Sequence, residues 1–291
     1  MSARQLHFAY GSNLNDADRR RWCREEGVPD FFGPPVRVAW LPDHEAVFHY
    51  YSSSRQGGAL DVTPRAGQLV AGALYEMGAE EARILARKEG APHRYERCDV
   101  HVLGPDLEVV PAFTFRVSEA HRRPTLIEPT AEYLRVVCEG LRSLGLDDAG
   151  VRHAARGEPA PWLIDGLFMY GTLMRGECRH ACLQSAWGID GPHPATARGA
   201  LVDLGEYPGL VAGTRVVPGE YVRFREPGMA LAALDQVEGF VGHGRAAGSL
   251  FERVLIDATV GAGPPRRAWT YRWGGRTAGA PIVDGGWRDV R

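Results

Sequence analysis

Two groups of residues that could form a chemical site each occur twice in this chain. The first group is a turn sequence, which reads FAYGSNL at residues 8–14 and FMYGTLM at residues 168–174. The second is a Glu-Gly pair that follows each turn at a distance, at Glu89 and again at Glu238, with an arginine and strand-type residues after it. A packing motif alone would have little reason to keep both parts. The repeat therefore indicates a site that combines a turn with a candidate acid.

The first turn is expected between a strand and a helix. Residues 5–9 have the pattern of a strand, and residues 16–22 begin with an acid and continue with good helix formers. The glycine and asparagine between them permit a sharp bend. Backbone N–H groups are unpaired at the start of a helix and attract anions there, so the turn is a candidate anion-binding element.

The rest of the first half favours a small mixed sheet or barrel, because short β-type runs separated by Gly and Pro dominate residues 36–117. Residues 79–87 are predicted to form a short helix, which places Glu89 at or just past its C-terminal end. An amphipathic helix is predicted over residues 130–144, and a polar connector containing proline over residues 147–161.

The second half repeats this order of elements. A strand leads to the second turn, and a helix containing Cys178 and Cys182 is expected after it, followed by short strands. Residues 231–235 then lead into Glu238. At 291 residues the chain is about twice the usual domain length of ~150 residues, so we expect two similar domains, 1–157 and 162–291.

Composition points to a small-molecule partner. The 34 basic and 36 acidic residues leave a formal net charge of −2, and this balance argues against nucleic acid or an anionic membrane as a partner. No stretch approaches the ~18 apolar residues that a membrane span needs. The five cysteines are an odd number without a disulfide pattern, which favours free thiols and a cytoplasmic location. The abundance of glycine and arginine suggests a bacterial source of high GC content.

Several short motifs together resemble one family. YGSNL at residues 10–14 is similar to the signature turn of the γ-glutamylcyclotransferases, and YGTLMRGE at residues 170–177 is similar to that of the AIG2-like, γ-glutamylamine cyclotransferase branch. In the first half, further matches are KEG at 88–90, YER at 95–97 and PTAEYL at 129–134. In the second half they are YPGLV at 207–211, VPGEY at 217–221, LDQVEG at 234–239 and WTY at 269–271.

The resemblance implies an α+β fold of two tandem γ-glutamylcyclotransferase-like domains, each a small mixed β-barrel with flanking helices. It also implies a reaction in which the α-amino group of a γ-glutamyl compound attacks its own γ-carbonyl group. That attack releases 5-oxoproline and expels an amine or an amino acid. No cofactor or metal is implied, and a glutamate with a raised pKa would serve as general acid and base.

The resemblance assigns roles to twelve residues. Glu89 and Glu238 are the candidate catalytic residues. The candidate substrate-binding residues are Tyr10, Gly11, Ser12, Asn13 and Leu14 in the first turn and Tyr170, Gly171, Thr172, Leu173 and Met174 in the second. The backbone N–H groups of the four residues after each tyrosine would hold the glutamyl carboxylate or the developing oxyanion. Glycine is expected in both turns because a side chain would block close approach.

Plainer roles compete with these assignments. The two tyrosines could be core aromatics at strand ends, and the two glutamates could be solvated charges at helix ends. Arg97 and Arg253 are expected to be structural ion-pair partners, and His49, His93 and His243 lie in segments that could border the sites.

Other functions also remain open. The domains could bind a γ-glutamyl or amino-acid ligand without catalysis, one domain could be active and the other degenerate, or the chemistry could be amide hydrolysis. The sequence leaves open the leaving amine and the choice between monomer and homodimer.

Overall fold

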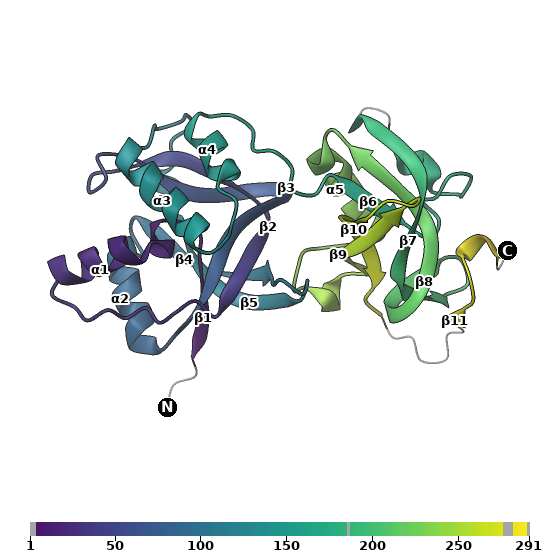
Figure 1. Ribbon diagram of the computed structural model, residues 1–291, viewed down its shortest axis with the longest axis horizontal. Helices are drawn as coiled ribbons and strands as arrows, with labels where there is room; N and C mark the ends of the chain where they lie inside the picture. The colour runs from purple at the N-terminus through teal and green to yellow at the C-terminus, as the bar shows by residue number, and fades with distance from the viewer. Residues whose placement is uncertain (1–3, 185–186, 276–281, 290–291) are drawn as a thin grey trace. The chain divides into compact units, whose positions relative to one another are not determined.

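The computed structural model describes residues 4–184, 187–275 and 282–289, and the chain divides into two compact units, Met1–Pro161 and Trp162–Arg291 (Figure 1). Each unit contains a mixed β-barrel with flanking helices, so the chain has the predicted α+β fold. In the described residues, no helix combines the length and the apolar character that crossing a membrane requires.

The N-terminal unit is a closed five-stranded barrel. Its strands are β1 (Gln5–Ala9), β2 (Arg37–Ser52), β3 (Gly57–Met77), β4 (Tyr95–Leu103) and β5 (Val109–Val117). They are ordered β1-β3-β2-β4-β5, and a parallel pairing of β1 with β5 at His7 and Phe113 closes the barrel. This closure places the turn that follows β1 beside the end of β5.

Helices α1 (Asp16–Glu25), α2 (Ala79–Glu89), α3 (Ala131–Ser143) and α4 (Ala149–Ala155) flank this barrel (Figure 1). The Asn15 side chain caps α1 by accepting from the Asp18 N–H, and the Thr130 hydroxyl caps α3 by accepting from the Tyr133 N–H. The predicted connector over 147–161 is partly wrong, because α4 forms within it. Val151 buries its apolar side chain against the barrel core and stabilises that short helix.

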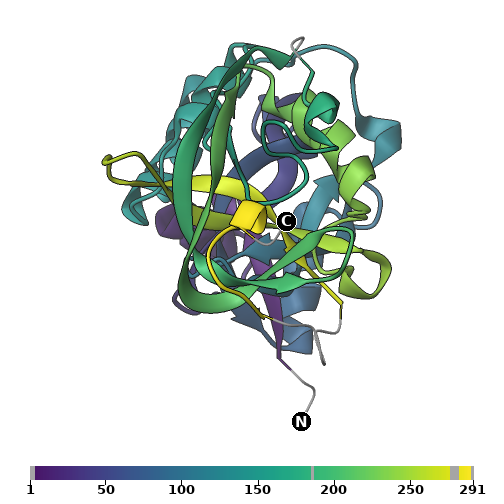
Figure 2. The same ribbon diagram turned by 90° about the vertical axis from the view of Figure 1, so that its right-hand side faces the viewer.

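The C-terminal unit is a second barrel of the same design, which faces the viewer in Figure 2. Its strands are β6 (Gly166–Met169), β7 (Ile189–Asp203), β8 (Pro208–Phe224), β9 (Phe251–Val260), β10 (Pro265–Trp273) and β11 (Ile282–Val283), and its α-helix is α5 (Pro227–Glu238). The strand order is β11-β7-β8-β6-β10-β9, and pairing of β7 with β9 closes the barrel. As in the first unit, the short strand before the turn is parallel to one neighbour, here β10.

The predicted helix with Cys178 and Cys182 is wrong. Turns follow β6 instead, and only the 3₁₀ helix η3 (His180–Cys182) forms there. Gly176 has a φ of +84°, a left-handed conformation that interrupts an α-helix. Further 3₁₀ helices in the described part of the chain include η1 (Ser12–Leu14), η2 (Glu119–His121), η5 (Ala246–Gly248) and η6 (Trp287–Asp289).

The same contact fixes the strand before each turn. The Thr114 hydroxyl donates to the Phe8 carbonyl oxygen at 2.8 Å, and the Thr270 hydroxyl donates to the Phe168 carbonyl oxygen at 3.0 Å. Phe8 and Phe168 are buried in their barrels, and each ring lies against a glycine of the long neighbouring strand.

That glycine is Gly72 in one unit and Gly219 in the other. A Cβ atom added to Gly72 would lie 2.2 Å from the Ala9 carbonyl oxygen, and one added to Gly219 would lie 2.2 Å from the Met169 carbonyl oxygen. Only glycine lets the short strand approach so closely.

We therefore expect Gly72→Ala to lower the free energy of unfolding of the N-terminal unit by about 1–3 kcal/mol, because the added methyl group meets backbone atoms that cannot rotate away. Urea denaturation followed by circular dichroism measures the change. Gly150→Ala is the matched control, since a Cβ there meets nothing within 4 Å and alanine favours the α4 helix. Equal stability of the Gly72 variant and the unmodified chain would contradict the prediction.

Candidate active sites in the two barrels

A cavity of about 40 Å³ lies where the first turn meets the C-terminal end of α2. Its lining includes Tyr10, Asn13, Glu89, Tyr95 and Tyr133, which come from the turn, α2, β4 and α3. This volume is that of one or two water molecules. The cavity thus marks where reacting atoms could meet, and the rest of a substrate would extend beyond it.

Tyr10 is fixed at the wall of this cavity as a neutral hydrogen-bond donor. Its hydroxyl donates to the Phe115 carbonyl oxygen at 2.6 Å and lies 3.4 Å from the Asp61 carboxylate. Burial, reinforced by the negative charge of Asp61, raises the Tyr10 pKa well above its ordinary value. Asp61 itself is fully buried and accepts from the Val117 N–H at 3.0 Å and from His49 Nε2 at 2.7 Å.

Glu89 is the last residue of α2, and Gly90 ends that helix with a φ of +68°. A hydrogen-bonded chain holds its carboxylate. Asn13 Nδ2 donates to Glu89 Oε1 at 2.7 Å, and Lys88 Nζ donates to Asn13 Oδ1 at 2.7 Å. The turn residue Asn13 therefore contacts the candidate acid through its side chain.

A cavity of about 30 Å³ occupies the equivalent place in the C-terminal unit. Tyr170 and Glu238 line it, and the Tyr170 hydroxyl donates to the Tyr271 carbonyl oxygen at 2.6 Å, as Tyr10 does to Phe115. Burial raises the Tyr170 pKa, so this hydroxyl also stays protonated. Phe251 lines this cavity where Tyr95 lines the first, so the second site lacks that hydroxyl.

Glu238 is the last residue of α5, and Gly239 ends that helix with a φ of +64°. The Glu238 side chain is buried, and it makes no hydrogen bond with any residue that the structure describes. Burial raises its pKa to about 7, and the positive charge of Arg179 opposes that rise. A carboxyl group with a pKa near 7 can both accept and return a proton at neutral pH.

The turns offer fewer N–H groups than the sequence suggested. The Leu14 N–H donates to the Gly11 carbonyl oxygen at 3.0 Å, and the Met174 N–H donates to the Gly171 carbonyl oxygen at 2.9 Å. Each of these two N–H groups therefore closes its own turn, and the predicted substrate-binding role of Leu14 and Met174 stays a prediction. At most three N–H groups per turn remain for an anion.

The two turn glycines differ. A Cβ atom added to Gly171 would lie 2.6 Å from Pro208 Cγ, so glycine is required in the second turn. A Cβ atom added to Gly11 would lie 3.9 Å from Leu60 Cδ2, an ordinary contact. The protein itself therefore leaves room for a side chain at Gly11, and the expectation that a side chain there would block close approach stays a prediction.

The arginines after each Glu-Gly pair also differ. Arg253 is buried and pairs with Asp235 at 3.0 Å, as predicted for a structural ion pair. Arg97 is exposed, and no ion pair to it is found among the described residues. It lies 3.9 Å from the centre of the Phe113 ring and donates to the Gln5 side chain, so its predicted ion pair is wrong.

Three residues at the sites escaped the sequence analysis as individual candidates. Tyr133 reaches the first cavity from α3, and Tyr207 and Arg179 line the second. Both tyrosines stood inside motifs that resemble the family, PTAEYL and YPGLV, and this was the available signal. His49 is one of the three histidines that the sequence placed in segments that could border the sites. It is hydrogen-bonded to Asp61, which lies close to the Tyr10 hydroxyl, and it does not line the cavity.

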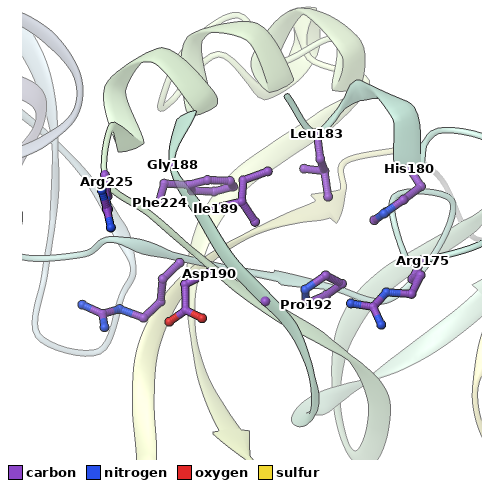
Figure 3. Close-up of a pocket in the computed structure, with 11 residues that line it drawn as sticks. Arg175, His180, Leu183, Gly188, Ile189, Asp190, Pro192, Phe224 and Arg225 are labelled. Atoms are coloured by element: carbon purple, nitrogen blue, oxygen red, sulfur yellow. The ribbon is translucent and has the colours of Figure 1, made fainter. Parts of the chain in front are cut away.

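A larger pocket of about 860 Å³ also lies in the C-terminal unit (Figure 3). Figure 3 shows Arg175 and His180 on one side of it and Arg225 and Asp190 on the other. Neither Glu238 nor any part of the second Tyr-Gly turn lines this pocket. We assign the site to the smaller cavity, because it alone joins the turn to a buried carboxyl group.

Comparison with known proteins agrees with this architecture. The family described as "Gamma-glutamyl cyclotransferase, AIG2-like" matches residues 167–289, and the "AIG2-like family" matches residues 69–153. A solved structure of a γ-glutamyl cyclotransferase is 20% identical, with a TM-score of 0.44 over 55% of this chain and 92% of its own.

Two further relatives are more similar in sequence. The γ-L-glutamyl-butirosin B γ-glutamyl cyclotransferase of Niallia circulans is 34% identical over 109 residues, which are 37% of this chain and 66% of that protein. A Vibrio cholerae protein provisionally named a γ-glutamylcyclotransferase is 43% identical over 72 residues, which are 25% of this chain and 60% of that protein. The matches thus span less than two thirds of either relative. With one family match in each unit and the same turn, helix end and barrel in both, the chain belongs to the γ-glutamyl cyclotransferase and AIG2-like family, as a tandem of two such domains.

Proposed function

We propose that this protein releases 5-oxoproline from γ-glutamyl compounds. The α-amino nitrogen of the substrate attacks its own γ-carbonyl carbon, which forms a five-membered lactam and breaks the bond to the leaving amine. The proton that the attacking nitrogen loses passes to the departing nitrogen, and no water is consumed. The observation that supports this proposal most strongly is that each barrel brings a Tyr-Gly turn and one glutamate together in a single cavity.

Glu89 and Glu238 are the proposed proton carriers. In the ionised form each carboxylate accepts the proton of the substrate amine, and in the protonated form it gives that proton to the leaving group. The burial of Glu238 and its pKa of about 7 support this role in the second site. In the first site, the Asn13 amide points the Glu89 carboxylate toward the cavity.

The turns are the proposed anion cradles. The remaining N–H groups of Gly11, Ser12 and Asn13, and of Gly171, Thr172 and Leu173, lie next to the acid in their cavities. Groups of this kind stabilise a carboxylate or a developing oxyanion when they point at it. Tyr10 and Tyr170 hold the walls in place through their bonds to the neighbouring strand. The substrate supplies its own nucleophile, so the enzyme needs only to orient it and move a proton.

The leaving group is the least defined part of the proposal. The relative from Niallia circulans is named for γ-L-glutamyl-butirosin B, which supports testing larger γ-glutamyl compounds beside simple amines and amino acids. All five cysteines are free, and this fits the proposed cytoplasmic location. A monomer and a homodimer are both compatible with two sites in one chain.

Replacing both acids should abolish the reaction. We expect Glu89→Gln and Glu238→Gln, combined, to lower 5-oxoproline release by a factor of about 10²–10⁴, because glutamine cannot carry the proton. The assay measures 5-oxoproline from a panel of γ-glutamyl amines, γ-glutamyl amino acids and γ-glutamyl-protected metabolites. Each single variant reports the rate of the opposite site, and thermal unfolding checks that the variants fold.

The products separate this mechanism from its competitors. Hydrolysis would yield free glutamate and incorporate ¹⁸O from labelled water, whereas cyclisation yields 5-oxoproline without the label. Binding of γ-glutamyl compounds without turnover would favour a ligand-binding protein. An unchanged rate in the double variant would exclude both glutamates as proton carriers.

The second site should also show a defined pH dependence. In the Glu89→Gln chain, kcat/KM should rise about tenfold per pH unit up to pH 7 and then level off. The sign follows from the raised pKa, since Glu238 is protonated below about 7 and only the carboxylate can accept a proton. A pH–rate profile from pH 5 to 9 tests this. A rate that falls as the pH rises through 7 would mean that the protonated form is the one required.

A further inference from the structure

The chain contains a single lysine. Of its 34 basic residues 33 are arginines, and the exception is Lys88, which immediately precedes Glu89. Lysine differs from arginine in shape and in hydration, so one lysine among 33 arginines can mark a place that suits only the ammonium group. Its surroundings give a physical reason.

Lys88 lies half-buried on the last turn of α2, between the aromatic ring of Trp22 and the first turn. Its ammonium group is 5.8 Å from the centre of the Trp22 ring and donates to Asn13 Oδ1 at 2.7 Å. Burial lowers the Lys88 pKa, while the negative charge of Glu89 opposes that shift. A compact ammonium group on a narrow stem fits such a place, and the broad planar guanidinium of arginine does not.

The contact sets the direction of the Asn13 amide. An ammonium group can only donate, so Asn13 must turn its carbonyl oxygen toward Lys88. Its NH₂ group then faces Glu89, to which it donates at 2.7 Å. Glu89 Oε1 is thereby held as the acceptor of this hydrogen bond.

The position of Glu89 on its helix gives a reason for a positive charge nearby. The carboxylate of Glu89 stands at the C-terminal end of α2, where the partial negative charge of the helix dipole disfavours a second negative charge. Lys88 places a positive charge in the same turn and offsets that cost. The two hydrogen bonds of the Asn13 side chain also fix the direction in which the Glu89 carboxylate points.

The second site provides a natural comparison. Leu173 stands where Asn13 stands in the first turn, and Val237 precedes Glu238 as Lys88 precedes Glu89. Both members of the polar chain are thus replaced by apolar residues, and α5 has no basic residue in its last turn. Glu238 there makes no hydrogen bond with a described residue. The glutamate is therefore held by a polar chain in the first barrel and lacks such a chain in the second.

We propose that Lys88 is a positioning residue of the N-terminal site, which acts through the Asn13 side chain to hold the Glu89 carboxylate directed into the cavity. The kinetic part of this inference rests on the proposed cyclotransferase function. Its structural part, the coupling of Lys88 to Glu89 through Asn13, stands without it.

The kinetic test uses the Glu238→Gln chain, in which only the N-terminal site can turn over. Lys88→Met should lower kcat by about 10–100-fold with a smaller change in KM. Arg87→Met is the matched control, since Arg87 lies on the same helical turn, is exposed, and pairs with Glu26 at 3.8 Å. It removes the same charge and should change neither kcat nor KM.

A merely structural role would lower the yield or stability of the Lys88 variant, while its folded fraction would keep the kcat of the parent chain. An unchanged kcat in Lys88→Met, or equal effects of Lys88→Met and Arg87→Met, would overturn the proposal.

The single lysine also permits a direct test that needs no substrate. A chain grown with ¹³C-labelled lysine has one labelled side chain, whose titration by nuclear magnetic resonance gives the pKa of Lys88. Asn13→Leu and Glu89→Gln should each shift this titration, and Glu26→Gln, which removes an equal charge beside Arg87, should not. If no γ-glutamyl compound is turned over, the proposed function fails while this coupling can still be observed. If neither Asn13→Leu nor Glu89→Gln changed the titration of Lys88, the inference would be overturned, whether or not the protein turns over γ-glutamyl compounds.

Discussion

The hydrogen bond from the turn tyrosine to the neighbouring parallel strand is the contact on which each site depends. Tyr10 donates to the carbonyl oxygen of Phe115, and Tyr170 donates to that of Tyr271, at 2.6 Å in both units. The bond forms only because the barrel closes, which brings a short first strand beside a strand from the end of the domain. The tyrosine then cannot swing away, and the turn that follows it faces the helix end with the glutamate. Closure of the barrel therefore also forms the site.

The two units use this common frame for different electrostatic environments. In the N-terminal unit, polar groups surround the acid. Lys88 donates to Asn13, which in turn donates to Glu89, and Asp61 lies close to the Tyr10 hydroxyl. In the C-terminal unit, Glu238 is buried and makes no hydrogen bond with a described residue, and Arg179 lines the same cavity. A carboxyl group that loses water without gaining hydrogen bonds keeps its proton to a higher pH, which is the cause of the raised pKa of Glu238. One fold thus places a glutamate in two different surroundings within one chain.

Local sequence was sufficient where the structure depends on local rules. Asn15 and Thr130 cap α1 and α3 as such residues do, and Gly90 and Gly239 end α2 and α5 by adopting positive φ. The placement of Glu89 at a helix end followed from this pattern. The predicted helix after the second turn failed at Gly176, because a run of good helix formers does not reveal that one glycine adopts a left-handed conformation. The short helix α4 was missed because its stability comes from packing Val151 against the barrel.

The sequence alone determined that two similar domains exist, that each has a Tyr-Gly turn and a distant glutamate, and that these parts resemble one family. Repetition makes such inferences possible, because two copies of a pattern show which residues belong together. Only the tertiary structure decided which atoms meet. The pairing of Lys88, Asn13 and Glu89, the use of the Leu14 and Met174 N–H groups inside their own turns, and the burial of Glu238 all depend on distances between segments far apart in the chain. Hydrogen bonding and desolvation act over a few ångströms, and those distances are set by closure of the barrel.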